Sequence, residues 1–120
     1  MNRPVLAMIV ALRLSAACAT ERPVDGEPLP AWLTGLIQQL ENQPVANPPA
    51  FIARYEYRDE VVYYLPARCC DIPSNLYNAV GTIVCHPDGG YSGTGDGRCA
   101  DFFAERKNEK VLWRDLRVAA

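Results

Sequence analysis

The sequence predicts an α+β domain in which one N-terminal helix packs on a small antiparallel sheet of three to four strands. The domain is expected to be cross-linked by disulfides and to contain a glycine-rich loop. Three observations lead to this fold class. One apolar stripe has helical spacing, and two adjacent runs are rich in β-branched and aromatic residues. Five cysteines and ten prolines in 120 residues are typical of a cross-linked, loop-rich fold. A chain of this length has room for one core.

The composition argues against one class of partner. Hydrophobic residues make up 49% of the chain, and 12 Lys and Arg stand against 14 Asp and Glu, which gives a net charge of −2. Proteins that bind nucleic acid concentrate positive charge on one face to meet the phosphate backbone. The sequence therefore predicts no nucleic-acid partner.

Residues 1–18 have the pattern of a secretory signal peptide. Arg3 precedes an apolar run over residues 5–12, which is too short to span a bilayer. Small residues then lead to Cys18, an end that is similar to the lipobox of bacterial lipoproteins, where the cysteine is lipidated and becomes the mature N-terminus. The alternative is ordinary cleavage behind Ala19, which leaves no anchor. Both interpretations predict export.

Residues 19–30 contain three prolines and little apolar content, which predicts a tether of at most roughly 40 Å before a single globular domain over residues 31–120. Removing residues 1–18 takes away two of the twelve basic residues and leaves ten against fourteen acidic ones, a net charge of −4. Ala19 behind Cys18 resembles the outer-membrane sorting pattern. We therefore expect an outer-membrane lipoprotein facing the periplasm or the surface, or otherwise a periplasmic or secreted protein.

The first element of the folded part is a predicted helix over residues 31–41. Pro30 suits the start of a helix, and 42–44 (Asn-Gln-Pro) end it. Five apolar side chains gather on one helical face: Trp32, Leu33, Leu36, Ile37 and Leu40. This stripe must be buried against another element for so short a helix to be stable.

Two strands follow. Residues 51–57 (FIARYEY) alternate between faces, and residues 60–65 (EVVYYL) are apolar on both faces, which favours a central strand. Arg58-Asp59 between them is a candidate tight turn. We expect a hairpin that pairs Tyr55 and Tyr57 with residues of the run over 61–65 (VVYYL).

The remaining segments are less regular. Residues 76–85 predict a bent or interrupted third strand, and 87–99 hold five of the eight glycines and predict a loop. Residues 100–110 have the composition of a helical turn, whereas 111–115 look more like a last strand.

Four cysteines of the exported part, Cys69, Cys70, Cys85 and Cys99, predict two disulfides. Adjacent Cα atoms lie about 3.8 Å apart, below the spacing of roughly 4.4 to 6.8 Å in relaxed disulfides. A bond between Cys69 and Cys70 is therefore disfavoured. Two connectivities stay open, namely 69 with 85 plus 70 with 99, or 69 with 99 plus 70 with 85. A zinc site would need its paired ligands spaced by two to four residues, which these lack.

The glycine-rich loop fails the sequence tests for two common sites. Asp96 and Gly97 stand where a P-loop needs Lys and Ser or Thr. Thr94 stands where a nucleophile elbow needs glycine. A weaker alternative is Ca²⁺ binding by the carboxylates of Asp88 and Asp96 with loop carbonyls. The competing interpretation is that Asp and Gly simply supply turn conformations.

One ordered set of motifs carries a family resemblance: Val62-Tyr63-Tyr64, Cys69-Cys70-Asp71, Leu76-Tyr77-Asn78, and the run from Cys85 to Cys99 with its PDGG and GDG segments. The chain resembles the DUF6970 family, a domain of unknown function found in small exported or lipid-anchored proteins. The resemblance implies export and paired cysteines. It implies no activity and no catalytic residue.

The leading functional hypothesis is a non-catalytic, disulfide-stabilised envelope domain, exported and anchored to the membrane through a lipid on Cys18. Its expected partners are an envelope protein or a glycan, with no cofactor. The alternatives are a Ca²⁺-binding module that uses Asp88 and Asp96, and a small cell-envelope hydrolase.

Overall fold

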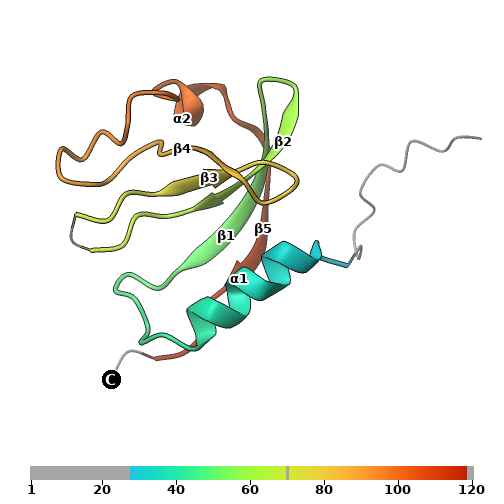
Figure 1. Cartoon of the computed structure of the whole chain (residues 1–120), viewed down its shortest axis with the longest axis vertical. Coiled ribbons are helices and arrows are strands. Elements are labelled where there is room, and N and C mark those ends of the chain that lie inside the picture. Colours follow the sequence, from blue (N-terminus) through green and yellow to red (C-terminus); the bar gives the residue numbers. More distant parts are fainter. Residues whose placement is uncertain (1–27, 70, 119–120) are drawn as a thin grey trace, which may run out of the picture.

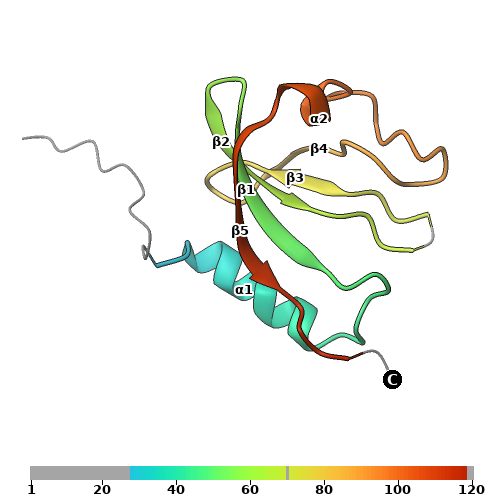
Figure 2. The same ribbon diagram turned by 180° about the vertical axis from the view of Figure 1, so that it is seen from behind.

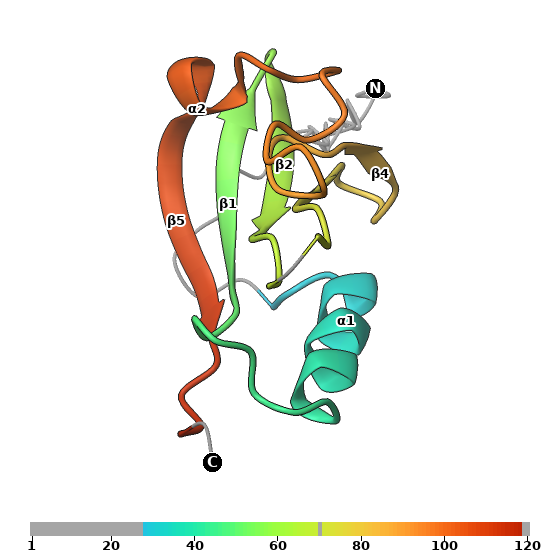
Figure 3. The same ribbon diagram turned by 90° about the vertical axis from the view of Figure 1, so that its left-hand side faces the viewer.

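A computed structural model describes residues 28–69 and 71–118, and Figures 1 and 2 show its architecture from two sides. Five strands form one antiparallel sheet in the order β4-β3-β2-β1-β5. Their bounds are β1 Phe51–Tyr57, β2 Glu60–Leu65, β3 Asn75–Tyr77, β4 Ile83–Cys85 and β5 Lys107–Arg114. Helix α1 (Ala31–Glu41) lies along one face of this sheet, as Figure 3 shows from the side. The short helix α2 (Phe102–Glu105) follows the glycine-rich loop.

The predicted α+β class is confirmed, and the sheet has more strands than expected. The segment over 76–85 forms a hairpin of two short strands, because the Asn78 side chain accepts hydrogen bonds from the amides of Val80 and Thr82 and folds the chain back. The last strand begins already at Lys107, directly after the helical turn. The helical turn is therefore shorter than the predicted segment 100–110, and the strand includes residues 107–110 as well as 111–114.

The predicted hairpin β1–β2 is present. Arg58 and Asp59 both have positive φ, 51° and 61°, as a two-residue hairpin turn requires. Tyr55 pairs with Val62 as predicted, whereas Tyr57 pairs with Glu60, one residue before the predicted run, because the turn has only two residues. This tight turn fixes which side chains of both strands face each side of the sheet.

Helix α1 covers one face of the sheet with the stripe that its sequence predicts. Leu33, Ile37 and Leu40 are buried against a cluster that includes Ile52 and Tyr63.

Trp32 ties this helix to the β3–β4 hairpin. The indole N–H of Trp32 donates to the carbonyl of Ala79 over 2.9 Å. Its ring lies so close to Gly81, whose φ is +86°, that a Cβ there would sit 2.6 Å from a ring carbon. This close approach requires glycine at position 81.

The opposite face of the sheet carries a second cluster that the sequence did not predict. Phe102 of α2 is fully buried, and its ring centroid lies 5.3 to 5.5 Å from those of Tyr55, Tyr57 and Tyr64. Cys99 is buried in the same cluster. The fold thus has three layers, because α2 and the segment leading into it cover the face that α1 leaves open.

The C-terminal tail returns to helix α1. The Arg117 guanidinium donates to the carbonyls of Leu40, Glu41 and Gln43 at the end of this helix, and it pairs with Asp115 at 2.8 Å. The last carbonyls of a helix have no partner within the helix. Arg117 therefore acts as a C-terminal cap supplied from the other end of the domain.

Edge strand β5 is irregular. Its register against β1 shifts between Ile52 and Ala53 and again between Arg54 and Glu56, and Asn108 has a φ of 55°. Within the described residues, no helix is long and apolar enough to cross a membrane.

Candidate functional site

The glycine-rich loop is closed by a disulfide between Cys85, the last residue of β4, and Cys99, which precedes α2. Their Cα atoms lie 6.2 Å apart, and both residues are buried. Both connectivities that the sequence left open are therefore wrong. The loop turns back on itself, so the two cysteines at its ends, 14 residues apart in the sequence, meet. Cys69 is also disulfide-bonded, but not to Cys85 or Cys99, and Cys70 lies outside the described residues.

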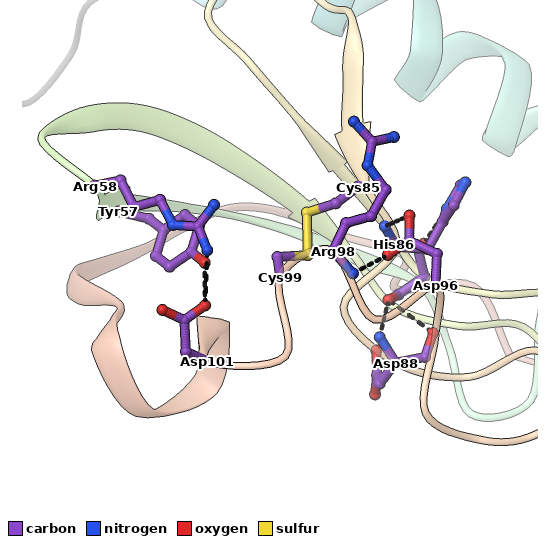
Figure 4. Close-up of a disulfide and its surroundings, with 10 residues drawn as sticks. Tyr57, Arg58, Cys85, His86, Asp88, Asp96, Arg98, Cys99 and Asp101 are labelled. Carbon is purple, nitrogen blue, oxygen red and sulfur yellow. Dashed lines mark hydrogen bonds and ion pairs between the residues drawn. A yellow bond between two sulfur atoms is a disulfide. The ribbon is translucent and has the colours of Figure 1, made fainter.

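Asp96 holds the base of this loop together, as Figure 4 shows. Its carboxylate accepts hydrogen bonds of 3.0 Å from the backbone amides of His86 and Arg98, and its own amide donates to the His86 carbonyl. Desolvation raises the pKa of Asp96, but the two amide hydrogen bonds outweigh it and the net pKa is lowered. The ionised carboxylate thus holds together the two ends of the loop, at His86 and at Arg98.

Asp88 fixes the loop to the sheet. Its carboxylate accepts a hydrogen bond of 2.9 Å from the Tyr64 hydroxyl on β2. Its amide donates to the Ser74 hydroxyl, and its carbonyl accepts from the Ser74 amide. Burial, followed by the bond to Asp88, raises the pKa of Tyr64 above its ordinary value. The loop is therefore docked on β2 and on the start of β3.

The structure gives Asp88 and Asp96 separate hydrogen-bond partners. Two further aspartates lie near the cysteines: Asp101 accepts hydrogen bonds from Tyr57 and Arg58, and Asp71 is exposed. Within residues 28–69 and 71–118, no group of three or more His, Cys, Asp or Glu side chains is arranged to hold a metal ion. Calcium binding at this loop stays a prediction from the sequence.

The tip of the loop is exposed to solvent. Tyr91 is 96% exposed. It lies in a turn closed by a hydrogen bond from the Gly93 amide to the Gly90 carbonyl, and the Ser92 and Thr94 hydroxyls lie 2.9 Å apart beside it. His86 does not reach this tip, since its Nδ1 donates to the Ser74 carbonyl at 2.7 Å. The braced loop thus presents an aromatic ring to solvent.

Two hollows lie beside the β1–β2 turn. The larger, of about 570 Å³, is rich in carboxylates. It is lined by Glu56, Tyr57, Arg58, Asp59, Glu60, Val61, Asp101, Glu105 and Lys107. The smaller, of about 170 Å³, adjoins the disulfide. It is lined by Tyr57, Arg58, Glu60, Val62, Val84, Cys85 and Arg98.

Sequence reasoning concentrated on the aspartates of the loop and missed Tyr91 and Arg98. The sequence could have indicated the exposure of Tyr91, because this residue lies between Gly89-Gly90 and Ser92-Gly93 at the centre of the loop, where no strand can bury it. The sequence gives no such signal for Arg98, because the position of this residue in the fold depends on which cysteine is bonded to the neighbouring Cys99.

The fold and its braced loop define a small α+β domain with a disulfide-closed loop docked on its sheet. The chain belongs to the family described as Domain of unknown function (DUF6970), whose model matches residues 38–115, from α1 to just beyond β5. This confirms the family that the sequence motifs predict. No curated protein and no solved structure is detectably similar to this chain.

Proposed function

We propose that this protein is an exported, lipid-anchored protein of the cell envelope whose domain is a non-catalytic binding module. The observation that carries the proposal is the braced loop over residues 86–98, which ends in the exposed ring of Tyr91. A loop held by a disulfide and by internal hydrogen bonds loses little conformational entropy when it binds. Exposed tyrosines are frequent anchors of protein interfaces. A partner in the envelope, either a protein or a glycan, fits this arrangement.

Export is supported by the disulfide between Cys85 and Cys99, because disulfides persist in oxidising compartments. The signal-like residues 1–18 and the anchor residue Cys18 lie outside the described residues. A lipid on Cys18 and the tether over 19–30 would hold the domain close to a membrane surface.

The anchor is tested by intact mass spectrometry of the protein extracted from membranes. We expect a mature chain that begins at Cys18 and carries the added mass of the lipid. Cys18→Ser should release the protein into the soluble fraction. A mass that corresponds to cleavage between Ala19 and Thr20 would contradict the anchor.

The binding role is tested by crosslinking in native envelopes. We expect Tyr91→Ala to abolish a crosslinked partner that the unaltered protein retains. Val80→Ala is the matched control, since Val80 is 74% exposed on the β3–β4 turn, away from the loop tip. If both variants retain the same partners in the same amounts, Tyr91 is not the binding anchor.

A further inference from the structure

The smaller hollow beside the disulfide combines an apolar floor with two cations. Val62 and Val84 belong to the cluster on the α2 face of the sheet, and Cys85, whose sulfur is bonded to Cys99, also lines the hollow. The hollow measures about 170 Å³, less than the roughly 300 to 1,000 Å³ of pockets that enclose whole drug-sized ligands. It has room for one small group of a ligand.

The two arginines that line this hollow differ in how they are held. The Arg58 guanidinium is 3.1 Å from the Asp101 carboxylate and 4.8 Å from the centre of the Tyr57 ring. The Arg98 guanidinium donates no hydrogen bond to any residue in the described part of the chain, although its backbone amide bonds Asp96. Figure 4 shows the two arginines on opposite sides of the disulfide. Arg98 is thus an exposed cation beside an apolar surface, and its charge also contributes to the lowered pKa of Asp96.

The surrounding charges restrict which anion can bind. Glu60 also lines the hollow, and Arg58 is already paired with Asp101. The larger hollow, which shares Tyr57, Arg58 and Glu60 with this one, is rich in carboxylates. A ligand with several negative charges would be repelled by these groups. A single carboxylate is matched by the guanidinium of Arg98, which makes no side-chain hydrogen bond within the described residues.

We propose that this hollow binds one carboxylate on a short aliphatic stem, such as the C-terminal carboxylate of a peptide that ends in a small apolar residue. The carboxylate accepts hydrogen bonds from the Arg98 guanidinium, and the stem packs on Val62, Val84 and the disulfide. The inference rests on the proposed binding function and names a ligand class for it.

The test is a titration of the full-length chain, carrying Cys18→Ser and with its disulfides oxidised, with N-acetyl-L-valine and with the uncharged N-acetyl-L-valinamide. Backbone amide shifts in NMR spectra report the site. We expect saturable shifts at Val62, Val84 and Arg98 with the acid only. Arg98→Gln should weaken binding by about tenfold or more, because it removes a charge-assisted hydrogen bond. Arg114→Gln, which alters an exposed arginine on β5, should leave the affinity unchanged.

Equal binding of the acid and the amide, or equal affinity of Arg98→Gln and the unaltered chain, would overturn the inference. The titration contains no envelope partner. If crosslinking recovers no partner even with the unaltered protein, that result counts against the proposed function alone. If the acid shows no saturable binding in the titration, that result counts against this ligand class alone.

Discussion

At the scale of the residue, Gly95 occupies the tightest point of the braced loop. Its φ is +68°, and a Cβ built on it would lie 2.0 Å from the His86 carbonyl oxygen. We therefore expect Gly95→Ala to lower the free energy of unfolding by more than about 2 kcal/mol, measured by chemical denaturation.

Gly97→Ala is the matched control for this substitution. Gly97 has a similar φ of +75°, but a Cβ there would meet nothing within 4 Å. Only the backbone strain of about 1 kcal/mol applies to it. Equal losses in the two variants would show that the close approach to His86 does not matter.

The hydroxyls of Tyr55 and Tyr57 couple stability to alkaline pH. Burial, followed by hydrogen bonds to Glu109 and Asp101, raises the pKa of both tyrosines to about 12. In the unfolded chain the pKa is about 10. The unfolded chain therefore loses these protons first, so the stability present below pH 10 is lost as the pH rises from about 10 to about 12.

We expect Tyr57→Phe to make this alkaline decline shallower, measured as the free energy of unfolding at several pH values. Tyr91→Phe is the control, because the Tyr91 side chain is 96% exposed. An unchanged slope in Tyr57→Phe would contradict the coupling.

At the scale of the element, helix α1 depends on a residue far along the chain. It has no side-chain cap at its N-terminus and no basic residue in its last turn. Its last carbonyls are bonded by Arg117, which the Asp115 carboxylate holds in place. We expect Arg117→Gln to lower the melting temperature and to speed hydrogen exchange of the α1 amides.

Arg114→Gln serves as the comparison, since Arg114 is exposed on β5 and contacts the ring of Phe51 rather than α1. If both substitutions speed exchange of the α1 amides equally, the cap contributes nothing specific to the helix.

The elements that the sequence predicts well are those whose signals are local. The spacing of Leu33, Ile37 and Leu40 predicts α1 with its observed bounds, and Arg58-Asp59 predicts the hairpin turn. The caps and contacts that span the chain have no local signal. Arg117 lies 76 residues from Glu41, and nothing in the residues around it indicates a helix cap.

At the scale of the whole molecule, the Cys85–Cys99 disulfide joins two layers of the fold. The two cysteines are 14 residues apart in the sequence. Closing a loop of this length stabilises a fold by roughly 3 kcal/mol, mainly by restricting the unfolded chain. We expect the double variant Cys85→Ala, Cys99→Ala to be less stable by about this amount, measured by denaturant unfolding.

The double variant removes two sulfur atoms as well as the bond between them. Both cysteines are buried, so a small part of the loss comes from the missing sulfur atoms. Reduction of the unaltered chain should destabilise it at least as much, because it also breaks the disulfide of Cys69. A double variant as stable as the oxidised chain would contradict the expected role of the bond.

The family and the fold class follow from the sequence, whereas the cysteine pairing and the three-layer arrangement do not. Pairing depends on where the loop folds, and the loop folds where Asp96 bonds the amides of His86 and Arg98. The burial of Phe102 depends in turn on that closure, because Cys99 brings α2 onto the sheet.

The irregular ladder of β5 has a consequence for many copies held on one surface. An outer strand with regular, unpaired backbone groups is a template for joining the sheets of neighbouring molecules. The two register shifts and the left-handed Asn108 twist this strand out of a straight line. If the copies are crowded side by side on a membrane, this distortion disfavours the joining of their sheets through the β5 edges.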